Sequence, residues 1–136
     1  MIQKQSHTTV YVLDQDKAKA FYTDKLGFEV RNDVAMGPFR WLTVSPKSQP
    51  DLEIILMPIA AGPAMDEATA ATVRGLVAKG AFGCGVLETA DCRKTYEELK
   101  AKGVSFQCEP VERPYGIEAV LKDDSGNWFS MVQRPR

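Results

Sequence analysis

Residues 7–30 read HTTVYVLDQDKAKAFYTDKLGFEV, and this stretch holds the elements that decide the fold. Its first seven residues are rich in β-branched and aromatic side chains, which is typical of a strand. Asp14 is a suitable N-cap for a helix over DQDKAKAFYTDKL, whose apolar residues recur at helical spacing. Gly27 ends that helix, and FEVRND follows as a second strand. The stretch therefore predicts a strand, a helix and a strand in close succession.

The second half of the chain repeats this order. PFRWLTVS and DLEIILMP add two strands to the first half, and GCGVLET begins the second half as a strand. Asp91 caps the helix DCRKTYEELKAK, Gly103 ends it, and VSFQCEP, GIEAVLK and NWFSMVQ are three further strands. Each half is thus β-α-β-β-β and is too small to bury a core alone. We expect one domain over 1–136, with modules at about 5–58 and 81–134 and a connecting helix at about 65–79.

Matching positions in the two halves support a duplication. His7 and Cys84, Asp14 and Asp91, and Glu53 and Ser130 are separated by the same number of residues. These pairs correspond to the strand start, the helix cap and a position in the last strand. The spacing predicts that Cys84 is the counterpart of His7 and that Ser130 is the counterpart of Glu53.

Composition restricts the classes of partner. Hydrophobic residues make up 44% of the chain and the net charge is −1, so no concentrated basic surface is available for nucleic acid or an anionic membrane. The opening residues MIQKQSHTT hold no apolar run of signal-peptide length. The three cysteines have no CxxC spacing and are expected to be reduced thiols. We expect a cytoplasmic protein.

His7 and Glu53 are the first candidates for a site. His7 is the only histidine, and Glu53 is a charged residue among the apolar side chains of the strand DLEIILM, which begins with Asp51. A carboxylate inside such a strand requires a cation or a hydrogen-bond donor. Glu53 either pairs with a lysine or arginine near the exposed end of the strand, or contributes to a site with His7.

The repeated modules, the FYTDKLGF segment and the KDDSGN turn together resemble the vicinal oxygen chelate superfamily, which includes glyoxalase I, extradiol dioxygenases and bleomycin-resistance proteins. The resemblance covers essentially the whole chain. It implies an α+β fold in which two tandem βαβββ modules form a curved mixed sheet around a cleft. It also implies a homodimer, because many relatives build each cleft from two chains.

The resemblance implies a metal-binding role for His7 and Glu53, with Glu53 also the catalytic proton shuttle. The cofactor would be a divalent ion such as zinc or nickel, or none, because the second module carries Cys84 and Ser130 where such relatives carry stronger ligands. His7 and Glu53 are alternatively a hydrogen-bonded pair without metal. The residues expected to bind the substrate are Tyr11, Arg40, Cys84, Trp128 and Ser130.

Two functions follow from these residues. One is a metal-assisted lyase or isomerase of glyoxalase type; a dioxygenase is unlikely, because its ligand set needs two histidines. The alternative is a non-catalytic protein that sequesters a small molecule of the antibiotic type without a metal. A weaker third reading is a regulatory or scaffold role for residues 59–80, whose alanine-rich helix is more typical of a covering face.

Overall fold

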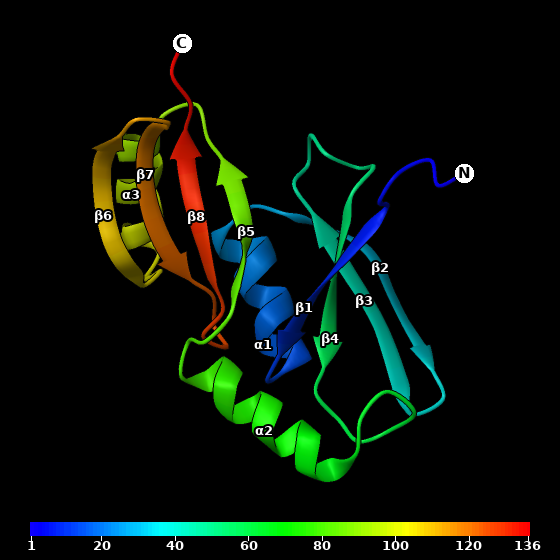
Figure 1. Ribbon diagram of the computed structural model, residues 1–136. Helices are drawn as coiled ribbons and strands as arrows, with labels where there is room; N and C mark the ends of the chain where they lie inside the picture. Colours follow the sequence, from blue (N-terminus) through cyan, green and yellow to red (C-terminus); the bar gives the residue numbers. More distant parts are fainter. The chain divides into compact units, whose positions relative to one another are not determined.

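The computed structural model describes residues 1–136, which form two compact units, Met1–Gly75 and Leu76–Arg136. The first unit contains β1 (His7–Val12), α1 (Gln15–Ala20), the π-helical turn η1 (Phe21–Lys25), β2 (Glu29–Met36), β3 (Phe39–Ser45) and β4 (Glu53–Pro58). Its sheet has the strand order β1-β4-β3-β2 (Figure 1). β1 runs parallel to β4, and the other neighbours are antiparallel.

The second unit has the same order of elements. It contains β5 (Gly83–Glu88), α3 (Cys92–Ala101), β6 (Phe106–Arg113), β7 (Gly116–Lys122) and β8 (Trp128–Gln133). The strand order is β5-β8-β7-β6, again with one parallel pair, β5 with β8 (Figure 1). The predicted α+β class with two tandem βαβββ modules is confirmed.

The helix ends follow from the residues predicted to set them. The Asp14 and Asp91 side chains each accept a hydrogen bond, at 3.0 Å, from the backbone N–H three residues later, so both are N-caps. Gly103, with φ of 87°, follows α3 in the left-handed conformation that glycine adopts readily.

Two helices differ from the prediction. The first continues from α1 into the wider turn η1, in which the Leu26 N–H donates to the Phe21 carbonyl oxygen. The connecting helix α2 (Glu67–Ala78) begins two residues after the predicted start, because Asp66 caps it through the Thr69 N–H at 2.8 Å.

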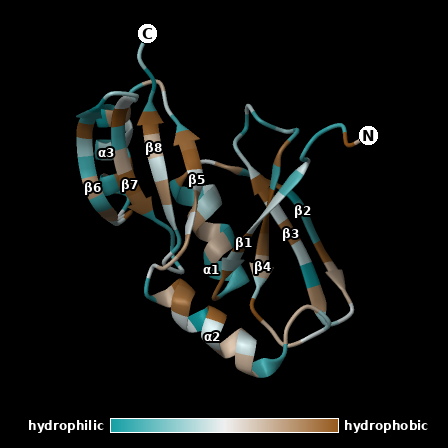
Figure 2. Ribbon diagram, viewed as in Figure 1, coloured by the Kyte–Doolittle hydropathy of each residue, from teal (hydrophilic) through white to brown (hydrophobic).

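Strand alternation gives each sheet a buried face and an open face. In β1 the buried Val10 and Val12 alternate with the more exposed Thr9 and Tyr11. Figure 2 shows the resulting bands of hydrophobic and hydrophilic residues along the strands. In each unit the buried face packs against the unit's own helix, α1 or α3. The open faces are therefore where accessible polar groups gather. No helix is long and apolar enough to cross a membrane.

Candidate functional site

The open face of the first sheet brings together the two predicted ligand residues. β1 and β4 begin side by side, with His7 paired to Glu53 in the parallel register. The Nε2 atom of His7 lies 3.4 Å from the Oε2 atom of Glu53, and the His7 ring lies 5.8 Å from that of Trp41. Glu53 therefore has His7 as its neighbour, and the interpretation that paired it only with a lysine or arginine is wrong.

Hydrogen bonds fix the Glu53 carboxylate in place. Its Oε1 atom accepts from the Thr43 hydroxyl at 2.6 Å and from the Asn32 amide at 2.8 Å. The bond from Thr43 is the largest cause that holds the pKa of Glu53 below its usual range, and it outweighs the opposing effect of burial. On the other side, His7 Nδ1 is 2.8 Å from the Ser6 hydroxyl. The pair is an ionised carboxylate beside an oriented imidazole.

These residues do not fit the resident metal that the resemblance implies. A catalytic zinc site uses three protein ligands and an open position. His7 and Glu53 supply two, and nowhere in the chain do three His, Cys, Asp or Glu side chains gather so as to hold a metal ion. One oxygen of Glu53 is also already engaged by two donors.

The other predicted residues of the first unit lie on opposite faces of its sheet. Tyr11 is on the open face with His7, four residues further along β1 and opposite Met57. Arg40 alternates with Trp41 and lies on the helix face, where its guanidinium donates to Asp33 at 2.8 and 3.0 Å and to Asp16 at 2.6 Å. The structure therefore does not bring Arg40 to the open face. Arg40 instead connects the sheet to α1 through its bond to Asp16.

The second unit places different residues at the positions of His7 and Glu53. Gly83 pairs with Trp128 as His7 pairs with Glu53, and each is the first residue of its strand. The same backbone bond precedes both pairs, because the Glu53 N–H donates to the Ser6 oxygen and the Trp128 N–H donates to the Phe82 oxygen. In the register of the strands the corresponding pair is therefore Gly83 with Trp128, whereas the sequence spacing had predicted Cys84 with Ser130.

A β-bulge explains this difference. The register of β5 against β8 shifts between Gly83 and Val86, where Gly85 has φ of 134°, a conformation that favours glycine. Ser130 is consequently opposite Val86. The extra residue preserves the separation between the helix caps but displaces the start of β5 by one residue, so a constant separation in sequence selects Cys84 in place of Gly83.

Gly83 and Trp128 leave no ligand at this position. A Cβ atom on Gly83 would lie 2.4 Å from Cζ2 of the Trp128 ring, so the ring covers the space that a side chain at residue 83 would need. Cys84 is within the bulge, where burial first and the negative charge of Asp123 second raise the pKa of its thiol to about 11. A thiol in that state is neutral near pH 7 and is a poor nucleophile.

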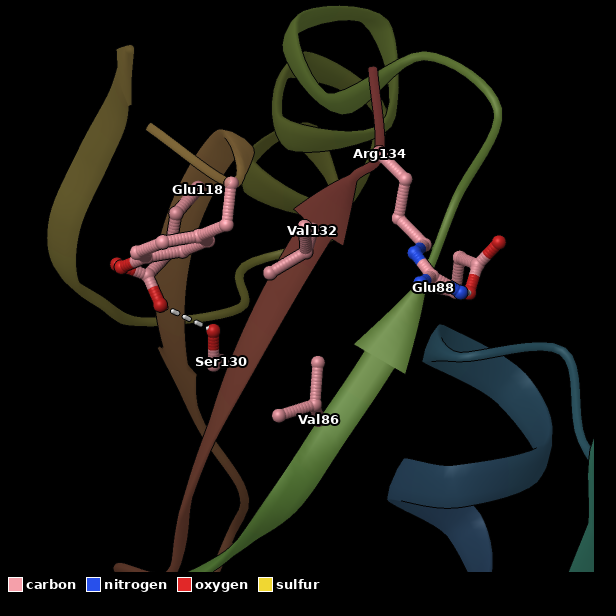
Figure 3. Close-up of a pocket in the computed structure, with 7 residues that line it drawn as sticks. Val86, Glu88, Glu118, Ser130, Val132 and Arg134 are labelled. Carbon is pink, nitrogen blue, oxygen red and sulfur yellow. Dashed lines mark hydrogen bonds and ion pairs between the residues drawn. The ribbon is translucent and has the colours of Figure 1, made fainter. Parts of the chain in front are cut away.

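The open face of the second sheet has its own pocket, of about 500 Å³ (Figure 3). Val86 of β5 and Val132 of β8 form an apolar surface in it, and Val86 is 68% exposed. The volume is typical of a site for a small organic molecule. The Ser130 hydroxyl of β8 points across to Glu118 of β7, and the two are hydrogen-bonded (Figure 3).

Glu118 is the polar centre of this pocket. Tyr115, which also lines the pocket, donates its hydroxyl to Glu118 Oε1 at 2.7 Å, and Arg113 Nε is 3.6 Å from the same oxygen. The bond from Ser130, followed by that from Tyr115, holds the pKa of Glu118 below its usual range. Glu118 is therefore an ionised carboxylate that accepts two hydroxyl hydrogens.

Sequence reasoning missed Glu118 although it found Ser130. Alternation within GIEAVLK places Glu118, Val120 and Lys122 on one face, which was a usable signal. The pairing of Val120 with Ser130 was also needed, and only the register of β7 against β8 supplies it.

Comparison with known proteins agrees with this fold. Residues 4–131 match the family described as the Glyoxalase/Bleomycin resistance protein/Dioxygenase superfamily. The chain therefore belongs to that superfamily. The resemblance predicted from the sequence is thereby confirmed.

Three relatives show how far the similarity extends. The uncharacterized protein YurT of Bacillus subtilis (strain 168) is 41% identical over 128 residues, which cover 93% of this chain and 96% of YurT. The crystal structure of UcmS2 is 56% identical with a TM-score of 0.92, and the match covers 98% of this chain and 99% of that one. The structure of TnmS3, an antibiotic binding protein from Streptomyces sp. CB03234, is 28% identical with a TM-score of 0.76, and 98% of each chain is covered.

Proposed function

We propose that this protein binds a small organic molecule on the open face of its second sheet and holds it without chemical change. The observation that carries the proposal is the pocket of about 500 Å³ over β5, β7 and β8, which combines the exposed Val86 with the oriented carboxylate of Glu118. Such pockets suit molecules with a large apolar body and a few polar groups. The structural similarity to TnmS3, an antibiotic binding protein, supports the same class of function.

The donor groups favour sequestration over metal-assisted catalysis. His7 and Glu53 are two ligands where a catalytic site needs about three, and Gly83 and Trp128 add none at the corresponding positions of the second unit. Glu53 is also a weak general base, because its hydrogen bonds stabilise the ionised form.

A thermal-shift screen against planar cationic antibiotics and aromatic metabolites tests the binding function. A molecule that binds only the native state at 100 times its Kd stabilises the protein by about 2.7 kcal/mol, which raises the melting temperature measurably. Compounds that raise it should then show saturable binding by calorimetry. If no compound in the screen stabilises the fold, the proposal is wrong.

A glyoxalase-type lyase is the second candidate, and the 3.4 Å approach of His7 to Glu53 is the observation that favours it. The test is metal analysis of protein purified without chelators, followed by an assay with the hemithioacetal of methylglyoxal in added nickel, cobalt or zinc. Bound metal with turnover would replace sequestration as the function.

We further propose that the protein is a cytoplasmic homodimer, as the family resemblance implies. Light scattering coupled to size-exclusion chromatography distinguishes a dimer from a 15.0 kDa monomer. A monomeric mass at micromolar concentration would contradict the proposal.

A further inference from the structure

The hydroxyl groups in the second-unit pocket have fixed hydrogen-bond directions. An ionised carboxylate only accepts, so the Ser130 and Tyr115 hydroxyls both donate their single hydrogens to Glu118. Each hydroxyl oxygen keeps its lone pairs free of that bond. Around Glu118 the pocket therefore presents hydrogen-bond acceptors, although two of the three groups are nominally donors as well; the donors of the pocket are on Arg134, beside Glu88.

The formal charges of the pocket are balanced within the second unit. Arg113, which does not itself line the pocket, lies 3.6 Å from Glu118. Arg134 and Glu88 both line the pocket and lie 3.8 Å apart. Each carboxylate thus has a guanidinium beside it. A ligand that carries a net charge would be attracted by one member of each pair and repelled by the other, so charge gives it little advantage.

We infer that this pocket selects neutral, largely apolar molecules that carry hydroxyl groups, an inference that rests on the proposed function. Ser130, Tyr115 and Glu118 recognise these molecules by accepting their hydroxyl hydrogens. Val86 and Val132 contact the apolar body of the molecule. A molecule of the same shape with a carbonyl or ether oxygen in place of the hydroxyl leaves the pocket oxygens without a donor. Such unpaired acceptors weaken binding by about tenfold.

The experiment compares aromatic compounds whose hydroxyl group donates a hydrogen bond with related compounds whose oxygen can only accept one. Dissociation constants are measured by fluorescence and calorimetry for 2-naphthol, 2-hydroxyfluorene and 1-hydroxypyrene, for their O-methyl ethers, and for 9-fluorenone. Each hydroxyl compound is expected to bind about tenfold more tightly than its ether, and 2-hydroxyfluorene more tightly than 9-fluorenone.

Glu118→Gln reverses the direction of the network. The amide NH2 of glutamine donates to one of the two hydroxyl oxygens, which releases that hydroxyl hydrogen toward the ligand. The ratio of 2-hydroxyfluorene affinity to 9-fluorenone affinity is then expected to fall about tenfold. Glu97→Gln makes the same chemical change on the exposed surface of α3 and should leave the ratio unchanged.

Ser130→Ala provides a second test should Glu118→Gln fold poorly, because it removes one acceptor and should lower the preference for hydroxyl over ether. Equal affinities for the hydroxyl compounds and their ethers would overturn the inference while the proposed binding function stands. An unchanged ratio in both variants would overturn it in the same way. If none of these compounds binds, and the thermal-shift screen also fails, the binding function and the inference fall together.

Discussion

Replacement of Gly83 by alanine tests whether the second unit lacks the ligand pair of the first. The new Cβ would lie 2.4, 2.6 and 2.7 Å from three atoms of the Trp128 ring, about 1 Å inside ordinary carbon–carbon contact. Gly83 does not have a positive φ, so alanine adds no backbone strain there. The cost is therefore steric, and we expect Gly83→Ala to lower the free energy of unfolding by about 1–3 kcal/mol.

A double-mutant cycle assigns that cost to the ring. In a Trp128→Ala background the Cβ meets no indole, so Gly83→Ala should be neutral or slightly stabilising, because alanine has less chain entropy to lose than glycine. Urea unfolding followed by circular dichroism gives the four free energies. In the single variant the ring must also rotate, which should change the emission of Trp128.

Gly62→Ala is the matched control, since a Cβ there meets nothing within 4 Å and the glycine has no positive φ. If Gly83→Ala is as stable as the original protein, with unchanged tryptophan emission, the ring does not lie over Gly83. The reasoning that a glycine and an indole occupy the positions of His7 and Glu53 would then be refuted.

Three further predictions concern stability. Gly75→Ala should raise the free energy of unfolding by about 1 kcal/mol in urea titrations, because Gly75 is inside α2 with open space around it; a loss would show an unseen contact. Asp33→Asn should lower the free energy of unfolding by about 1 kcal/mol at pH 7. The expected loss is this small because the bonds between Asp33 and Arg40 are partly exposed to solvent. Arg40 holds the pKa of Asp33 below that of an ordinary aspartate, so this contribution is complete above the ordinary value and is lost as pH falls through the lowered one. The difference in free energy of unfolding between the original protein and Asp33→Asn should therefore become smaller in acid. A difference that does not depend on pH would contradict the ion pair. Glu53→Gln should lower the free energy of unfolding by about 1–2 kcal/mol, because the hydrogen bond from Thr43 loses its charged acceptor. Thermal unfolding measures this loss, and an unchanged melting temperature would contradict that bond.

Local sequence patterns were sufficient to predict the elements of the fold. The caps Asp14 and Asp91, the terminal glycines and the alternation of strand residues each depend on neighbours within a few positions. The His7–Glu53 neighbourhood was predictable for the same reason, because both begin a strand and no bulge intervenes in β1 or β4. Arg40 was expected to bind the substrate, whereas alternation along β3 places it on the helix face, beside Asp16.

The pocket of the second unit could not be predicted in this way, because its chemistry depends on pairing between strands. In the first unit the hydroxyl is on β3 and the carboxylate on β4, as Thr43 and Glu53. In the second unit the carboxylate is on β7 and the hydroxyl on β8, as Glu118 and Ser130. The two open faces thus hold the same hydroxyl-to-carboxylate bond with its strands exchanged.

This exchange changes what each face can do. Glu53 keeps one oxygen directed toward His7, whereas Glu118 has Ser130 on one oxygen and Tyr115 on the other. The first carboxylate can therefore still engage the imidazole ring of His7, and through it a substrate proton. The second is saturated by hydroxyls and acts on a ligand mainly by directing their lone pairs. A chain with one such face of each kind is suited to orient a bound molecule more than to transform it.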